Sequence, residues 1–138
     1  MSKSKFNKLQ SVQNTLARVV VRQKKYDHIT LALKELHWLP VQYRVTFKTA
    51  ALVYLIKNTG QPAYLREILH DYVPVRTLRS SRNIICKNTV GTTLAARGFN
   101  NSAAAVWNNL PDDVLDVETI NIFKRKLKTH LYRKAFGT

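Results

Sequence analysis

Cationic side chains gather in three places along this sequence. They are Arg22, Lys24 and Lys25; Arg76, Arg79 and Arg82; and Lys124, Arg125 and Lys128. Lysine and arginine neutralise phosphates and release counterions, which gives affinity for nucleic acid without reading its sequence. Arginine also presents a planar fork that suits two-point contact with a phosphate. One such set is typical of a solvated face, but three together predict contact with RNA or DNA.

The charge balance favours the same partner. The 138 residues include 23 Lys and Arg against 8 Asp and Glu, for a net charge of +15. No acid precedes Asp27, and none lies between Tyr72 and Pro111. An excess of this size indicates a polyanionic partner or a second polypeptide that is missing here. Tyr26 and Tyr132 adjoin basic residues and offer rings for base stacking, although packing is the expected role of both.

Residues for catalysis or metal binding are not assembled in a recognisable pattern. The histidines form no HExxH pair; they are His28, His37, His70 and His130. The one acidic cluster fits helix starts; it comprises Asp112, Asp113, Asp116 and Glu118. A single cysteine, Cys86, excludes an internal disulfide and a multi-cysteine zinc site. Phosphate-binding glycine loops and the GxSxG motif are absent. We therefore expect no catalytic residue, no metal and no cofactor.

The elements that carry the cations are predicted to be mainly α-helical. Apolar residues recur at three- and four-residue spacing over about 5–22, over 31–36, after residue 40 and over 118–134. The segment 118–134 predicts a long C-terminal helix. In the helix after residue 40 the expected inward stripe is Val41, Val45, Lys48, Leu52, Leu55 and Ile56. Around 76–97, "IICKNT" and "TTLAA" predict a short β-hairpin or an extended segment. We expect one small domain over 1–138, helical over 5–70 and mixed over 71–138.

A corner is predicted between two of these helices, at His37, Trp38, Leu39 and Pro40. Pro40 lacks an N–H and suits the first position of a new helix. It also biases Leu39 away from the helical conformation, so the preceding helix should end near Leu36. We expect Trp38 and Leu39 to point inward, so that the chain changes direction around a buried indole.

A series of motifs in a fixed order carries a family resemblance. "KLQSVQNTLARVV", "DHITLALKELHWLPVQYRVTFK", "QPAYLREIL", "RTLRSS", "AARGFNNSAAAVWNNLP" and "FKRKLKTHLY" follow one another. Together they resemble the region shortly downstream of the polymerase domain in LINE-type (non-LTR) retrotransposon reverse transcriptases. The matching positions are Leu9, Gln10, Gln13, Asn14, His37, Trp38, Leu39, Pro40, Arg44, Tyr64, Leu65, Arg76, Arg79, Ser80, Trp107, Leu110, Pro111, Phe123, Lys124, Leu127 and Lys128.

The resemblance implies a supporting role in target-primed reverse transcription. In the family this region is presumed to help hold template RNA and target DNA. The polymerase's Tyr-Ala-Asp-Asp or Phe-Ala-Asp-Asp motif and the family's endonuclease domain have no counterpart in this chain. No catalytic residue is therefore carried over. The resemblance implies a noncatalytic C-terminal remnant of such an element, which binds nucleic acid and in its parent element contacts the polymerase domain.

Two other functions fit the pattern. The alternative hypothesis is a protein-interaction module that packs on the polymerase thumb or another partner. In that case the first helix should expose an apolar patch, formed by Phe6, Leu9, Val12, Leu16, Val19 and Val20. The third function is peripheral membrane binding through the basic helix at 120–134. No apolar run approaches the ~20 residues that span a bilayer, and 1–10 contain no signal-peptide core, so we expect an intracellular protein, nuclear or cytoplasmic.

Overall fold

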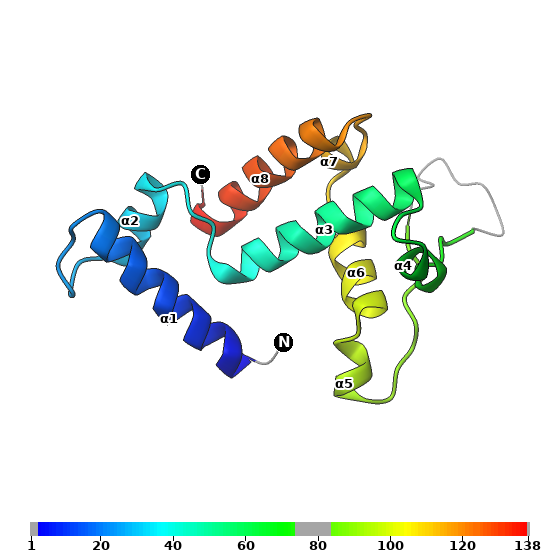
Figure 1. Cartoon of the computed structure of the whole chain (residues 1–138), viewed down its shortest axis with the longest axis horizontal. Helices are drawn as coiled ribbons and strands as arrows, with labels where there is room; N and C mark the ends of the chain where they lie inside the picture. Colours follow the sequence, from blue (N-terminus) through cyan, green and yellow to red (C-terminus); the bar gives the residue numbers. More distant parts are fainter. Residues whose placement is uncertain (1–2, 74–83, 138) are drawn as a thin grey trace. The chain divides into compact units, whose positions relative to one another are not determined.

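A computed structural model describes residues 3–73 and 84–137, and within these ranges the chain is mainly helical (Figure 1). The helices are α1 (Lys3–Val20), α2 (Ile29–Glu35), α3 (Val41–Thr59), α4 (Ala63–Ile68), α5 (Thr93–Ala96), α6 (Phe99–Asn108), α7 (Asp112–Leu115) and α8 (Ile120–Phe136). The predicted mainly α class and long C-terminal helix are confirmed.

The chain divides into two compact units. Unit 1 comprises Met1–Phe47 and Leu127–Thr138, and unit 2 comprises Lys48–Lys126. The helices α3 and α8 each contribute residues to both units. Each unit has its own buried side chains, so we describe them separately.

Unit 1 is built on a small cluster between α1 and α2. Ala17, Ala32 and Leu33 are buried, and the alanines let the two helices approach closely. Larger side chains pack around them; they are Val21, Ile29, Leu36, Trp38 and Phe136. Two tyrosines tie distant segments of the unit together. Tyr132 Oη donates to Lys34 O at 3.2 Å, and Tyr43 Oη donates to Lys134 O at 3.3 Å.

Helix α1 ends in a Schellman motif whose left-handed residue is an arginine. Arg22 has φ 54°, a conformation in which glycine is usual. Its N–H donates to Val19 O at 3.3 Å, and the N–H of Gln23 donates to Arg18 O at 3.0 Å. These two bonds satisfy carbonyls that the helix leaves open, and they turn the chain away from the helix axis. The basic segment 22–25 therefore begins where the chain direction reverses after α1.

Helix α2 ends in the same way, at the predicted corner. His37 has φ 51°, its N–H donates to Lys34 O at 3.1 Å, and the N–H of Trp38 donates to Leu33 O at 2.9 Å. The predicted helix end near Leu36 is confirmed, since Leu36 is the C-cap.

The inside of the corner differs from the prediction. Leu39 is buried, but Trp38 is only half-buried, and Pro40 precedes α3 rather than forming its first residue. The indole packs against a cluster of two alanines and one leucine, which is too small to enclose it. The buried indole of the chain is Trp107, which lies in unit 2.

Two glutamines from α1 hold the corner in place. Gln13 is 5% exposed, and its Nε2 donates to Leu39 O at 2.8 Å. Gln10 Oε1 accepts from the N–H of Val41 at 2.8 Å, which is one of the donors that the start of α3 leaves without an intrahelical partner. Gln10 Nε2 in turn donates to Gln13 Oε1 and to Asn14 Oδ1. The helical spacing of α1 places Gln10 and Asn14 on the polar face opposite its apolar row, but both are partly buried.

Unit 2 is organised around three aromatic rings. Phe123 of α8 is fully buried, with its ring 4.4 Å from the Tyr54 ring and 6.1 Å from the Trp107 indole. Tyr54 Oη donates to Val117 O at 2.8 Å, so its polar end is satisfied beside the apolar stack. The spacing of Ile120, Phe123, Leu127 and Leu131 predicts one inward stripe on α8, and the last three are buried while Ile120 is partly buried.

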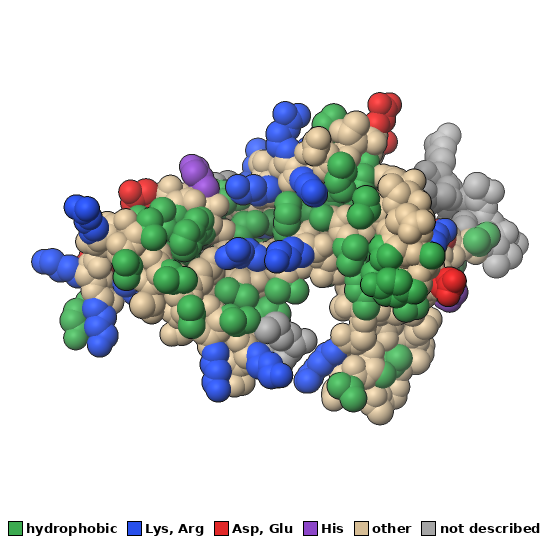
Figure 2. All heavy atoms as spheres, in the orientation of Figure 1, with side chains coloured by type: hydrophobic (Ala, Val, Ile, Leu, Met, Phe, Trp, Pro, Cys, Tyr) green, Lys and Arg blue, Asp and Glu red, His purple; other side chains and the backbone are tan. Residues whose placement is uncertain are grey.

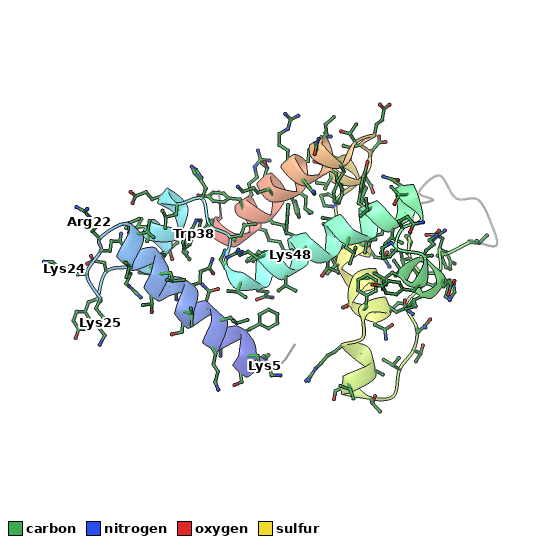
Figure 3. All side chains as sticks on the ribbon, viewed as in Figure 1. Lys5, Arg22, Lys24, Lys25, Trp38 and Lys48 are labelled. Carbon is green, nitrogen blue, oxygen red and sulfur yellow. The ribbon has the colours of Figure 1, made fainter. Side chains whose placement is uncertain are left out.

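The inward face of α3 was predicted only in part, since Ile56 of the expected stripe is buried but other members are not. The buried residues are Ala50, Val53, Tyr54 and Ile56. Val45 and Leu55 of the expected stripe are each 40% exposed, and Lys48 is also exposed (Figure 3). Apolar residues occur all round this helix, so its period did not select one face.

The segment before α5 is extended rather than a hairpin. One antiparallel bridge pairs Asp71 with Ile85, and the side chain of Asn108 donates to Ile85 O and accepts from Ile85 N. The predicted second strand, "TTLAA", contributes α5 instead. Thr92 Oγ1 accepts from the N–H of Ala95 at 3.2 Å, which caps a helix start and outweighs the β propensity of the threonines. Residues 76–83 of the predicted segment lie outside the described residues.

Candidate nucleic-acid interface

The loop after α1 presents the first predicted cationic set. Arg22, Lys24 and Lys25 are all exposed (Figure 3). The loop is closed by Asp27, whose Oδ2 accepts from the N–H of Lys24 at 2.8 Å and whose N–H donates to Lys24 O at 3.1 Å. The backbone of 22–27 is therefore held by a turn at each end, and the cationic side chains project from a fixed frame. We call 22–26 the cationic loop.

An aromatic ring stands within this loop. Tyr26 was expected to pack against other side chains, but it is 93% exposed. The ammonium of Lys25 lies 6.0 Å from its ring centroid, at the outer limit of a cation–π contact. Tyr132, the other tyrosine considered, does pack, with its ring 4.7 Å from that of Phe136. Only Tyr26 of this pair is therefore open for a base to stack on.

The predicted cations of α8 lie along one side of that helix. Lys124, Arg125 and Lys128 are exposed, and at 100° per residue they fall within about 100° of its circumference. Lys124 and Lys128 are about 6 Å apart along the axis. Phosphates on one strand of duplex DNA follow at about 3.4 Å along its axis, so the two side chains suit neighbouring or next-neighbouring phosphates.

Other predicted residues are not part of these two cationic groups. Arg76, Arg79 and Arg82 lie outside the described residues. The corner residues His37, Trp38, Leu39 and Pro40 lie between α2 and α3 in unit 1. Lys126, next to the α8 set, is engaged in structure, because its Nζ donates to Asp113 O at 2.8 Å. The described cations of the prediction are therefore those of the cationic loop and those of α8.

An ion-pair cluster in unit 2 was not anticipated. Asp71 accepts from Lys57 of α3 through Oδ1 and from Arg66 Nη2 of α4 at 3.0 Å through Oδ2. The side chain of Lys57 is only 9% exposed, and its Nζ lies 5.7 Å from the Trp107 ring centroid. Burial raises the pKa of Asp71, but hydrogen bonds from Lys57 and Arg66 and their charges lower it more, so this pKa lies below its ordinary value of 3.8.

We expect Asp71→Asn to destabilise the protein in a pH-dependent way. The folded-state pKa of Asp71 is lowered, so its stabilisation is present above the ordinary pKa of 3.8 and is lost as pH falls through the lowered value. The side chain is 38% exposed, so we expect a loss of only about 1 kcal/mol near neutral pH. Urea unfolding near pH 7 and at about pH 2 measures this. A difference between variant and wild type that stays constant with pH would contradict the assignment.

The outer side of α1 exposes a row of aliphatic side chains. The exposed fractions are 44% for Leu9, 58% for Val12, 54% for Leu16, 70% for Val19 and 57% for Val20. Figure 2 shows hydrophobic side chains at the surface along this helix. The expected apolar patch is therefore present, except that Phe6 is only partly exposed. We call these five residues the α1 stripe.

Two further kinds of site concern the part of the chain that the structure describes. No group of three or more His, Cys, Asp or Glu there is placed to hold a metal ion. Over the same residues, no helix combines the length and the apolar character that crossing a bilayer requires.

Fold and surface together define a class: a mainly helical protein of two small units that carries exposed cationic groups on a loop and along a helix. Comparison with protein-family models, with curated proteins and with solved structures found no match.

Proposed function

We propose that this protein binds RNA or DNA through phosphate contacts and performs no chemistry itself. The observation that carries the proposal is the cationic loop, where exposed Arg22, Lys24 and Lys25 stand beside the exposed ring of Tyr26 on a backbone fixed by hydrogen bonds. Cations bind the phosphates, and the phenol ring offers a stacking surface for an unpaired base. This combination favours single-stranded nucleic acid.

The α8 set supports the same function from a second element. Lys124, Arg125 and Lys128 add phosphate contacts but no aromatic partner, so they supply affinity without base selection. The family resemblance agrees with this function, since the corresponding region of non-LTR retrotransposon reverse transcriptases is presumed to hold template RNA or target DNA. An intracellular site of action, in the nucleus or the cytoplasm, belongs to the same proposal.

Salt dependence tests the proposal directly. The logarithm of the association constant should fall linearly with the logarithm of salt concentration, with a slope of about −0.7 per phosphate contacted on a single strand and about −0.9 on a duplex. Fluorescence anisotropy of labelled oligonucleotides of unrelated sequence measures both slopes. A flat salt response, or no binding at the lowest salt concentration, would end the proposal. If added salt lowered the affinity for only one of the oligonucleotide sequences, that result would contradict phosphate recognition.

A further inference from the structure

The α1 stripe has the spacing of a helix-pairing seam. Leu9, Val12, Leu16 and Val19 follow one another at intervals of three, four and three residues. This alternation marks the a and d positions along which two helices pack side by side. The stripe covers about 100° of the helix circumference and about 16 Å of its length. A helix of about three turns on another chain therefore matches it in length.

The inner side of α1 is already occupied, so the stripe is a second and separate face. Gln13 and Ala17 are buried toward the corner and α2, and Gln10 contacts the start of α3. These contacts fix the rotation of α1 within unit 1. The aliphatic residues lie on the adjoining side of the helix and face solvent, and a row of exposed aliphatic residues marks an interaction site.

We propose that the α1 stripe is a docking surface for an acidic amphipathic helix of another protein. The charge around the stripe selects this occupant. Lys8 takes the position that flanks the seam in a helix pair, and the cationic loop continues the positive charge beyond Val20. No acidic residue occurs in 3–26. A partner helix with glutamate or aspartate beside its own apolar seam would pair with these cations.

The same charges argue against a second copy of this chain. A second α1 carries no acid that could pair with Lys8 or with the other cations beside the stripe, and it adds only further positive charge. Like charges facing one another across an interface cost several kcal/mol. Nucleic acid is no better an occupant, because its phosphates gain nothing from aliphatic side chains.

A designed peptide tests the proposed chemistry on the full-length chain. The probe is a helical peptide of about three heptads with leucine at the seam and glutamate at the flanking positions. One control peptide replaces the leucines by serine, and another replaces the glutamates by lysine. Isothermal titration calorimetry should show binding of the probe and at least about tenfold weaker binding of each control. Equal binding of the serine peptide would reduce the effect to charge and overturn the proposal, and so would failure of the probe to bind.

Substitutions in the chain locate the binding. Val12→Gln with Leu16→Gln should weaken binding of the probe at least about tenfold, because both side chains lose apolar burial in the complex. The matched control is Val73→Gln with Leu94→Gln, two side chains that are 82% and 78% exposed elsewhere. Circular dichroism should be unchanged in both, since none of these side chains is buried. Equal losses in the two double variants would overturn the assignment to α1.

Sedimentation equilibrium distinguishes the other occupant. The wild-type chain should be monomeric at micromolar concentration. A dimer that dissociates on Val12→Gln with Leu16→Gln would overturn the proposal, because a second copy would then cover the stripe. The inference does not rest on nucleic-acid binding, so the same double variant should keep its affinity for oligonucleotides; a parallel loss of that affinity would place the stripe in the nucleic-acid interface and also overturn the proposal.

Discussion

Replacing Phe123 by alanine should lower the free energy of unfolding by about 3–5 kcal/mol. Phe123 is fully buried, and its ring stacks on Tyr54 at 4.4 Å and on Trp107 at 6.1 Å. Truncation removes the apolar burial of the ring and leaves a cavity between two aromatic neighbours that cannot close over it. Urea unfolding followed by the fluorescence of Trp107 and Trp38 measures the loss.

The matched control for this prediction lies one residue away on α8. Ile122 is 37% exposed, so Ile122→Ala should cost less than about 1 kcal/mol. Domains of this size are stable by about 5–15 kcal/mol, so Phe123→Leu serves as a milder change if the alanine variant is largely unfolded. A loss for Phe123→Ala no larger than that for Ile122→Ala would contradict the central role of this ring in unit 2.

Reversing the charges of the α8 set should weaken nucleic-acid binding by one to two orders of magnitude. The variant combines Lys124→Glu, Arg125→Glu and Lys128→Glu. If each side chain contacts one phosphate, the log–log salt slope should become shallower by about 2 on a single strand and by nearly 3 on a duplex. The side chains are exposed, so the fold should persist. Anisotropy titrations at several salt concentrations give both quantities.

A scattered variant with the same net charge controls for long-range attraction. Lys3→Glu, Lys87→Glu and Arg97→Glu alter exposed residues on three other segments. This variant should lose less affinity and keep a steeper slope than the α8 variant. If the two triple variants bind equally weakly, affinity follows the overall charge, and the α8 set is not a contact surface.

Strong local periodicity made parts of the fold predictable. In α8, apolar residues at 123, 127 and 131 alternate with lysine and arginine, so the buried face and the exposed cations both followed from the sequence. The cationic loop was found from composition alone. In α3 the apolar residues surround the helix, and the face that Tyr54 and Val53 bury is chosen by the rings of unit 2. Such a choice depends on neighbours that are distant in sequence.

The contacts that hold the corner were not predictable from local signals. Gln10 and Gln13 appear as ordinary surface residues, because their partners lie 31 and 26 residues further along the chain. The family resemblance had grouped these glutamines with Leu39 and Pro40, but without a physical reason. Asp71 was missed for the same cause, since Lys57 and Arg66 lie on two other elements. Thr92 was the exception: a threonine before an apolar run is a local N-cap signal, and the β-leaning composition of the segment concealed it.

Unit 1 is built from two segments at opposite ends of the sequence, and this arrangement affects the order of folding. Its tyrosine hydrogen bonds join residues 91 and 98 positions apart, whereas the hydrogen bond between Tyr54 and Val117 in unit 2 joins residues 63 apart. Closing a longer loop costs more chain entropy, and contacts of high sequence separation slow folding. Folding of unit 2 shortens the effective loop that unit 1 must close, because unit 2 is the segment between the two parts of unit 1. We therefore expect the C-terminal half of α8 to reach Lys34 and Tyr43 after the aromatic stack has formed, whereas α1 and α2 pair through contacts that are closer in sequence.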